Sequence, residues 1–217
     1  MLISSRRRLT GLIGGVAIAA LTVAATLTAP AVGRATVTMA APSKLSATEA
    51  VAQATSEDGA LRFDIAEDGK RFIWADKPVF DDGLPAHGAT YISQGYIYPD
   101  GTLSAKVDGV NADGSPEFPD KVLGQWSCYG WYFGDGAHAT DGPWVLSTQL
   151  YQFGSAWGEA TLVSEGYVLA NTGGTVSRAI TGGTGPFANV RGEMLDTNLG
   201  FNETEGGNAR YEVVLAS

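Results

Sequence analysis

Residues 179–194, AITGGTGPFANVRGEM, place a glycine-rich turn ahead of an alternating run that carries an arginine. Because side chains alternate along a strand, one face of this run would hold Phe187, Asn189, Arg191 and Glu193. If that face lines a cavity, Arg191 could hold a carboxylate, enolate or phenolate oxygen through charge-assisted hydrogen bonds. The alternatives for Arg191 are a structural ion pair, with Glu165 or Glu193, and a solvated outer face.

The glycines themselves could form a phosphate-binding loop, but their surroundings exclude it. A phosphate loop lies between a strand and a helix whose N-terminus faces the anion. Here Pro186 and an alternating run follow the glycines, with no Gly-Lys-Ser/Thr and no helical periodicity. We therefore interpret Gly182, Gly183 and Gly185 as a structural turn, in which glycine adopts positive φ without strain.

A second candidate for chemistry is Glu165, in the segment VSEGYVL, with Val163 and Tyr167 on the same face of a predicted strand. A carboxylate among apolar neighbours can have a raised pKa and act as a general acid or base. Arg191 and Glu165 are therefore the candidate catalytic residues. The alternative for Glu165 is an outward-facing surface glutamate.

The segment QWSCYGWYF, residues 125–133, is the richest in aromatic side chains. Aromatic rings stack on planar ligands, and they also fill barrel cores or cover the outside of sheets. The candidate ligand-binding residues, from this segment and the two above, are Trp126, Tyr132, Tyr167, Phe187 and Asn189. We interpret Cys128, on the same face as Trp126, as a small buried hydrophobic residue.

The composition narrows the classes of partner. Cys128 is the only cysteine, so an internal disulfide bond is impossible. The two histidines, His87 and His138, are too few for a histidine-rich metal site, and we expect neither a metal nor another cofactor. Four arginines before residue 35 leave ten basic and 23 acidic residues in the rest of the chain, a net charge of −13. A body this acidic repels nucleic acid and anionic lipid, so we exclude both as partners.

Residues 1–41 have the features of an export signal. Three arginines at positions 6–8 precede an apolar run over residues 11–28, and small residues follow. The arginines resemble the twin-arginine type of signal, and we expect cleavage near residue 31 or near residue 41. The alternative is an uncleaved membrane anchor, since the run is close to the lower limit of about 17 residues for a span. Both interpretations predict an extracytoplasmic protein, which after cleavage has no membrane contact.

The rest of the chain divides into a short connecting segment and a long run of strands. Residues 42–58 are expected to form a linker or a short helix, because SATE at 46–49 fits a helix capping box. From residue 59 to residue 217, apolar and polar residues alternate between turn signals such as PDG at 99–101. This spacing predicts about eight to ten strands in an antiparallel sandwich or barrel, and glycines inside the strands favour a sheet that closes.

The turn and the segment after it, Gly-Gly-Thr-Gly-x-Phe-x-x-x-Arg-Gly at residues 182–192, resemble the signature of dirigent proteins. The resemblance covers roughly residues 88–215. It implies the eight-stranded antiparallel β-barrel that dirigent proteins share with allene oxide cyclases. Some plant members carry an acid with an assigned catalytic part where this chain has Pro186, which argues against plant-type radical coupling.

The leading hypothesis is an exported barrel that binds a small apolar or phenolic molecule and guides its cyclisation, isomerisation or coupling. Holding geometry and excluding water would supply most of the catalysis, so no cofactor is implied. A second hypothesis is a non-catalytic carrier or cell-envelope protein with the same barrel. A third is an extracellular carbohydrate-binding β-sandwich. The resemblance also implies that such barrels can associate as homo-oligomers.

Overall fold

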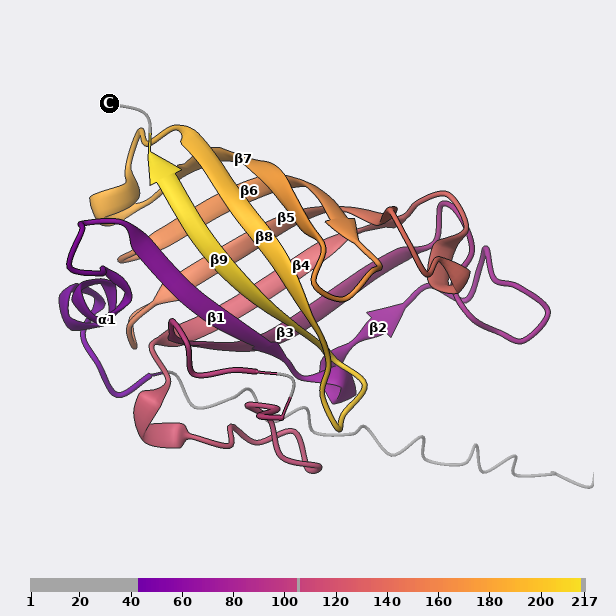
Figure 1. Ribbon diagram of the computed structural model, residues 1–217, viewed down its shortest axis with the longest axis horizontal. Helices are drawn as coiled ribbons and strands as arrows, with labels where there is room; N and C mark the ends of the chain where they lie inside the picture. The colour runs from indigo at the N-terminus through magenta and orange to yellow at the C-terminus, as the bar shows by residue number, and fades with distance from the viewer. Residues whose placement is uncertain (1–42, 105, 216–217) are drawn as a thin grey trace, which may run out of the picture. The chain divides into compact units, whose positions relative to one another are not determined.

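The computed structural model describes residues 43–104 and 106–215, which contain nine strands and one α-helix (Figure 1). The strands are β1 (Leu61–Glu67), β2 (Ile73–Trp74), β3 (Thr90–Pro99), β4 (Gly124–Tyr132), β5 (Pro143–Phe153), β6 (Thr161–Leu169), β7 (Thr175–Gly183), β8 (Gly192–Phe201) and β9 (Gly207–Leu215). The helix is α1 (Ala47–Ala54), and the 3-10 turns are η1 (Gly69–Arg71), η2 (Pro119–Lys121), η3 (Gly136–His138) and η4 (Gly185–Phe187). The predicted export signal, residues 1–41, lies outside the described residues. Among the described helices, none is long and apolar enough to cross a membrane.

The strands pair in the order β1-β9-β8-β7-β6-β5-β4-β3, and β1 also pairs with β3. Phe63 of β1 lies opposite Pro99 of β3 on one side and Tyr211 of β9 on the other, and both pairings are antiparallel. Strand β2 pairs with β3 beyond the end of β1 and so lengthens the barrel on that side. The predicted eight-stranded antiparallel barrel is confirmed, and the β-sandwich alternative is wrong because the sheet closes on itself.

Two glycines inside strands show why the sheet can close. A Cβ atom on Gly95 would overlap the carbonyl oxygen of Ala66, and one on Gly124 would overlap that of Gln152. Both positions therefore require the close approach of two backbones that glycine alone permits. Bends of this kind are what an antiparallel sheet needs to curl into a barrel.

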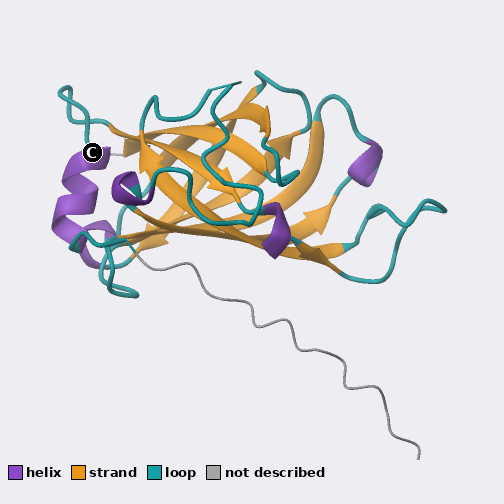
Figure 2. Cartoon of the chain, turned by 90° about the horizontal axis from the view of Figure 1, so that it is seen from below, coloured by secondary structure: helices purple, strands orange, loops and turns teal. Residues whose placement is uncertain are grey.

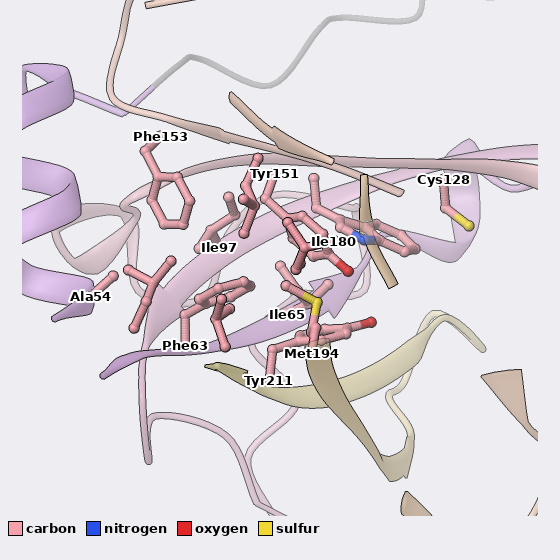
Figure 3. Close-up of a cluster of buried hydrophobic side chains, with 14 of the residues drawn as sticks. Ala54, Phe63, Ile65, Ile97, Cys128, Tyr151, Phe153, Ile180, Met194 and Tyr211 are labelled. Atoms are coloured by element: carbon pink, nitrogen blue, oxygen red, sulfur yellow. The ribbon is translucent and has the colours of Figure 1, made fainter. Parts of the chain in front are cut away.

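One end of the barrel is filled by aromatic side chains (Figure 3). Phe63 stacks on Tyr211, with 5.4 Å between the ring centroids. The same ring makes edge contacts with Tyr151 at 5.2 Å and Phe153 at 5.4 Å. Such pairs add to the stabilisation that burial of the rings provides. This end of the lumen is a packed aromatic core, in which Phe63, Tyr151 and Phe153 are fully buried.

The helix α1 lies across this filled end (Figure 2). Its buried residues, Ala50 and Ala54, join the aromatic core. The capping box is formed, because the Ser46 hydroxyl accepts from the backbone N–H of Glu49 and the Glu49 carboxylate accepts from that of Ser46. The segment that connects to the barrel is therefore helical where its side chains cover the core.

The glycine-rich turn also lies at the filled end. Strand β7 ends at Gly183, and Gly185 follows with φ of 56° at the start of η4. A Cβ atom on Gly185 would overlap the carbonyl oxygen of Glu159. Phe187, the last residue of η4, is buried against Phe153 with 5.7 Å between ring centroids. The turn thus holds one more aromatic ring in the core.

The residues after the turn do not continue as a strand. Asn189 has φ of 65°, and β8 begins only at Gly192. The expectation that Phe187, Asn189, Arg191 and Glu193 share one strand face is therefore wrong. The physical reason is that Gly185 and Pro186 begin a 3-10 turn, which interrupts the alternation of side chains. In β8 the inward residues are Met194 and Asp196, both buried.

Candidate binding cavity in the barrel

A cavity of about 70 Å³ lies inside the barrel beyond the aromatic core. Its walls come from the strand ends that lie away from α1: Glu67 ends β1, Val145 lies near the start of β5, and Val168 lies near the end of β6. The volume is enough for a few water molecules and is well below the roughly 300–1,000 Å³ of typical ligand pockets. A ligand must therefore be small, or part of it must extend through the opening.

Five aromatic side chains form a collar around the open side of the cavity: Phe72, Tyr91, Tyr132, Trp144 and Phe201. Phe72 stacks on Tyr91, with 5.2 Å between centroids and an angle of 10° between the planes. Trp144 makes edge contacts with Tyr132 at 5.8 Å and with Phe201 at 6.1 Å. Phe201 is 58% exposed, so the aromatic collar extends from the interior to the surface.

Asp196 of β8 is the most unusual residue in the cavity wall. It is only 2% exposed, and its Oδ2 atom has no hydrogen-bond partner among the described residues. Burial raises the pKa of this carboxyl to about 6, although the positive charge of Arg178 and a hydrogen bond with Tyr211 oppose the rise. A buried polar atom without a protein partner is rare, and here it belongs to a residue that lines a cavity. Asp196 can therefore accept a hydrogen bond from a bound molecule.

The guanidinium of Arg178 is buried beside this carboxyl, at 1% exposure. Its hydrogen-bond acceptors, at 2.9–3.2 Å, are Ser147 O and Oγ, Ser164 Oγ, Gly166 O and Tyr167 O. All of these acceptors are neutral, and Arg178 is not part of the cavity wall. The guanidinium therefore ties β5, β6 and β7 together and acts on Asp196 through its charge.

A second carboxylate, Glu67, lies at the end of β1 and also lines the cavity. Its Oε2 atom accepts a hydrogen bond of 2.6 Å from the backbone N–H of Gly207. Burial raises the pKa of Glu67, and this hydrogen bond works in the opposite direction. Across residues 43–104 and 106–215, no group of three or more His, Cys, Asp or Glu side chains could hold a metal ion.

The side chain of Gln149 fixes the inner wall. Its Oε1 atom accepts hydrogen bonds from Trp126 Nε1 at 3.0 Å, Tyr151 Oη at 2.6 Å and Tyr211 Oη at 2.8 Å. Three aromatic rings on three different strands are thereby held in place by one buried amide. The cavity wall is rigid at this point, which reduces the entropy lost when a ligand binds.

Cys128 lines the cavity but is not a nucleophile in its present setting. Its Sγ atom lies 3.3 Å from the hydroxyl of Tyr91. Burial raises the pKa of the thiol to about 12, so it stays protonated at neutral pH. This agrees with the interpretation of Cys128 as a small buried hydrophobic residue.

The structure brings two of the predicted ligand-binding residues to the cavity. Trp126 forms part of the inner wall, and Tyr132 belongs to the aromatic collar. Phe187 is buried as well, but it lies in the filled end of the barrel. The turn glycines lie at that end with it.

The other predicted site residues lie on the outside of the barrel. Glu165 is exposed and accepts a hydrogen bond of 3.3 Å from Thr148 Oγ1, and Tyr167 is exposed next to it on the same face. Asn189 is exposed in the turn. The Arg191 side chain is also exposed and donates to the carbonyl oxygen of Val190 at 2.7 Å. The structure therefore gives neither candidate catalytic residue a place at the cavity.

Asp196, Glu67 and the aromatic collar were missed by the sequence analysis. A signal for Asp196 exists in MLDTN, residues 194–198, since Met194 and Asp196 must share a face of one strand. A charged residue that shares the buried face of a strand with an apolar residue either has a hydrogen-bond or charge partner or serves a function. No comparable local signal identifies Phe72 or Phe201, because the collar is assembled from segments far apart in the sequence.

Fold and cavity together define an eight-stranded antiparallel barrel with a filled end and an open, acidic and aromatic end. No family model and no curated protein sequence matches the chain. Several solved structures are similar to it, and three of them match over 72% of its length. The first is a pyocyanin demethylase, with 16% identity, 99% of that chain covered and a TM-score of 0.46.

Two more of the similar structures are pterocarpan synthase dirigent proteins, from the family whose turn motif the sequence resembles. PsPTS1 has 16% identity, 92% coverage and a TM-score of 0.49, and GePTS1 has 15% identity, 82% coverage and a TM-score of 0.45. At this level of similarity the function has to be argued from the cavity itself.

Proposed function

We propose that the barrel binds a small, largely apolar or phenolic molecule with its ring inside the aromatic collar and its polar group on Asp196. The observation that carries this proposal is the free Oδ2 atom of Asp196, buried in a wall that is otherwise mainly aromatic and aliphatic. Ligand sites commonly combine an apolar lining with a few well-placed polar groups. A bound hydroxyl would supply the hydrogen bond that the Oδ2 atom of Asp196 lacks.

The same carboxylate can act as the base in a cyclisation or isomerisation of the bound molecule. A general acid or base works best when its pKa lies near the working pH, and that of Asp196 is raised to about 6. The rigid wall around Gln149 would limit the conformations open to a reactive intermediate. This assignment replaces Arg191 and Glu165, which lie outside the cavity, and it requires no cofactor. A carrier would use the same cavity without forming product.

Titration with phenol, followed through the tryptophan indole N–H signals in a ¹H–¹⁵N spectrum, tests where a ligand binds. Trp126 and Trp144 line the cavity, whereas Trp131 and Trp157 are exposed elsewhere. We expect the Trp126 and Trp144 signals to shift with a common dissociation constant while those of Trp131 and Trp157 stay in place. The signal of Trp74 is left out of this comparison, because its ring lies 5.9 Å from that of Phe72 in the collar. Single Trp→Phe variants assign the signals. Shifts confined to Trp131 would instead indicate binding on the outer face and would contradict the proposal.

We also propose that the chain is exported through the twin-arginine route, on the basis of residues 1–41. Replacing Arg6 and Arg7 with lysine is expected to stop export in a bacterial host that has this route, because the paired arginines are the recognised feature. N-terminal sequencing of the exported wild-type protein should place the cut near residue 31 or near residue 41. Unchanged export of the double variant would contradict the twin-arginine assignment.

A further inference from the structure

The side chains of the cavity wall that carry a charge at neutral pH are all acidic. Two carboxylates line it, Glu67 and Asp196. Among the described residues of the wall, none is lysine, arginine or histidine. The other titratable groups there are the thiol and phenols described above, which are neutral when protonated. Any fixed charge that a ligand meets at the wall is therefore negative.

Arg178, the buried cation whose charge acts on Asp196, does not cancel this negative charge. The hydrogen bonds of Arg178 all go to neutral oxygen atoms of β5 and β6, behind the wall. Its charge acts on Asp196 from a distance, but no N–H group of Arg178 bonds to the Oδ2 atom. The Oδ2 atom of Asp196 keeps an unused acceptor position, and the cavity wall holds two carboxylates against the one guanidinium of Arg178 behind it.

The aromatic collar, like the two carboxylates, favours a positively charged ligand. Ring faces carry partial negative charge and attract cations within about 6 Å, and the attraction is stronger when the cation is shielded from water. The stacked pair of Phe72 and Tyr91 and the edge-contact pair of Tyr132 and Trp144 line the same cavity as Asp196. An anion in the cavity meets these ring faces and the two carboxylates, and the favourable donor it finds in the collar is the indole N–H of Trp144, which has no partner among the described residues.

We propose that the cavity selects an aromatic molecule that carries a protonated amine, over neutral and anionic molecules of the same shape. This inference rests on the proposed function and narrows its ligand class. The aromatic ring would lie in the collar, and an ammonium N–H would donate to Asp196 Oδ2. An ammonium group satisfies both the free acceptor and the negative charge, whereas a hydroxyl satisfies only the acceptor.

A matched series of probes tests the selection on the full protein: benzylamine, benzyl alcohol and benzoate at pH 7.5. Dissociation constants come from the shifts of the Trp126 and Trp144 indole signals. We expect benzylamine to bind at least about tenfold more tightly than benzyl alcohol, in line with the greater strength of charge-assisted hydrogen bonds, and benzoate to bind most weakly. In Asp196→Asn the affinities for benzylamine and for benzyl alcohol should come within about twofold of each other.

Glu193→Gln is the control, because Glu193 is an exposed carboxylate on the outer face of the same strand. It should leave all three affinities unchanged. If benzyl alcohol binds as tightly as benzylamine, or if Asp196→Asn keeps the preference for the amine, the selection is overturned while the proposed function stands. If neither phenol nor any of the three probes shifts the two cavity signals, the proposed function fails as well.

Discussion

Asp196→Asn is expected to be more stable than the wild-type protein at pH 7, by up to about 3 kcal/mol, while binding its ligand less well. The pKa of the buried carboxyl rises from 3.8 to about 6 on folding, so the charged form costs stability in the folded state. Asparagine has nearly the same shape and no charge. A residue retained for packing would show the opposite sign, because its replacement would destabilise the fold.

The difference in stability between Asp196→Asn and the wild type should grow as the pH rises. Between about pH 4 and pH 6 the folded protein holds a proton on Asp196 that the unfolded chain has released. The stabilisation that the folded state gains from holding this proton is therefore complete below pH 4, and it is lost as the pH rises through 6. Urea unfolding at several pH values should give equal stabilities for the wild type and Asp196→Asn near pH 4 and diverging ones toward pH 7.

The Glu193→Gln protein serves as the reference for the loss of one carboxylate on β8. It should follow the wild-type curve across the whole pH range, because its side chain is exposed. A lower stability of Asp196→Asn at pH 7 would mean that the carboxylate holds the barrel together. In that case its free oxygen would not be a binding feature.

Arg178→Met is expected to lower the free energy of unfolding by about 3–5 kcal/mol, the usual cost of breaking a buried charged network. The guanidinium supplies donors to Ser147, Ser164 and two backbone carbonyl oxygens, and methionine supplies none. The matched control is Arg62→Met on β1. Arg62 pairs with Asp58 and Glu212 at the surface, so its loss should change stability little.

The same substitution should raise the pKa of Asp196 further, because the charge that opposes its rise is removed. Carboxyl ¹³C titration of Arg178→Met measures this directly. In the double variant with Asp196→Asn, the loss of stability should be smaller than in Arg178→Met alone, since no carboxylate is left buried without a counter-charge. Equal stability of Arg178→Met and the wild type would contradict the network described here.

The barrel was predictable from the sequence because its causes are local. Alternation along each strand gives the side chains their two faces, and turn residues separate the strands. Glycines inside the predicted strands favoured a sheet that closes, and two of them, Gly95 and Gly124, lie where two backbones touch. The capping box of α1 was visible for the same reason, since Ser46 and Glu49 act within one helical turn.

The cavity was only partly predictable, because its residues depend on which strand face points inward. The 3-10 turn at Gly185 interrupts the alternation, so an expectation carried from Phe187 into β8 selected the outer face. Trp126 and Tyr132 were identified correctly because no turn interrupts β4. The contacts of Gln149 and Arg178 join strands that are distant in sequence, and no local pattern reports them.

The most direct test of the account is a crystal structure of the protein soaked with 4-iodophenol, with the iodine located by its anomalous scattering. We predict an iodine peak within the aromatic collar, near Trp144 and Phe201, with the phenol oxygen within hydrogen-bonding distance of Asp196 Oδ2. An iodine peak only on the outer face, beside Trp131 and Tyr167, would contradict the claim that this barrel binds its ligand inside.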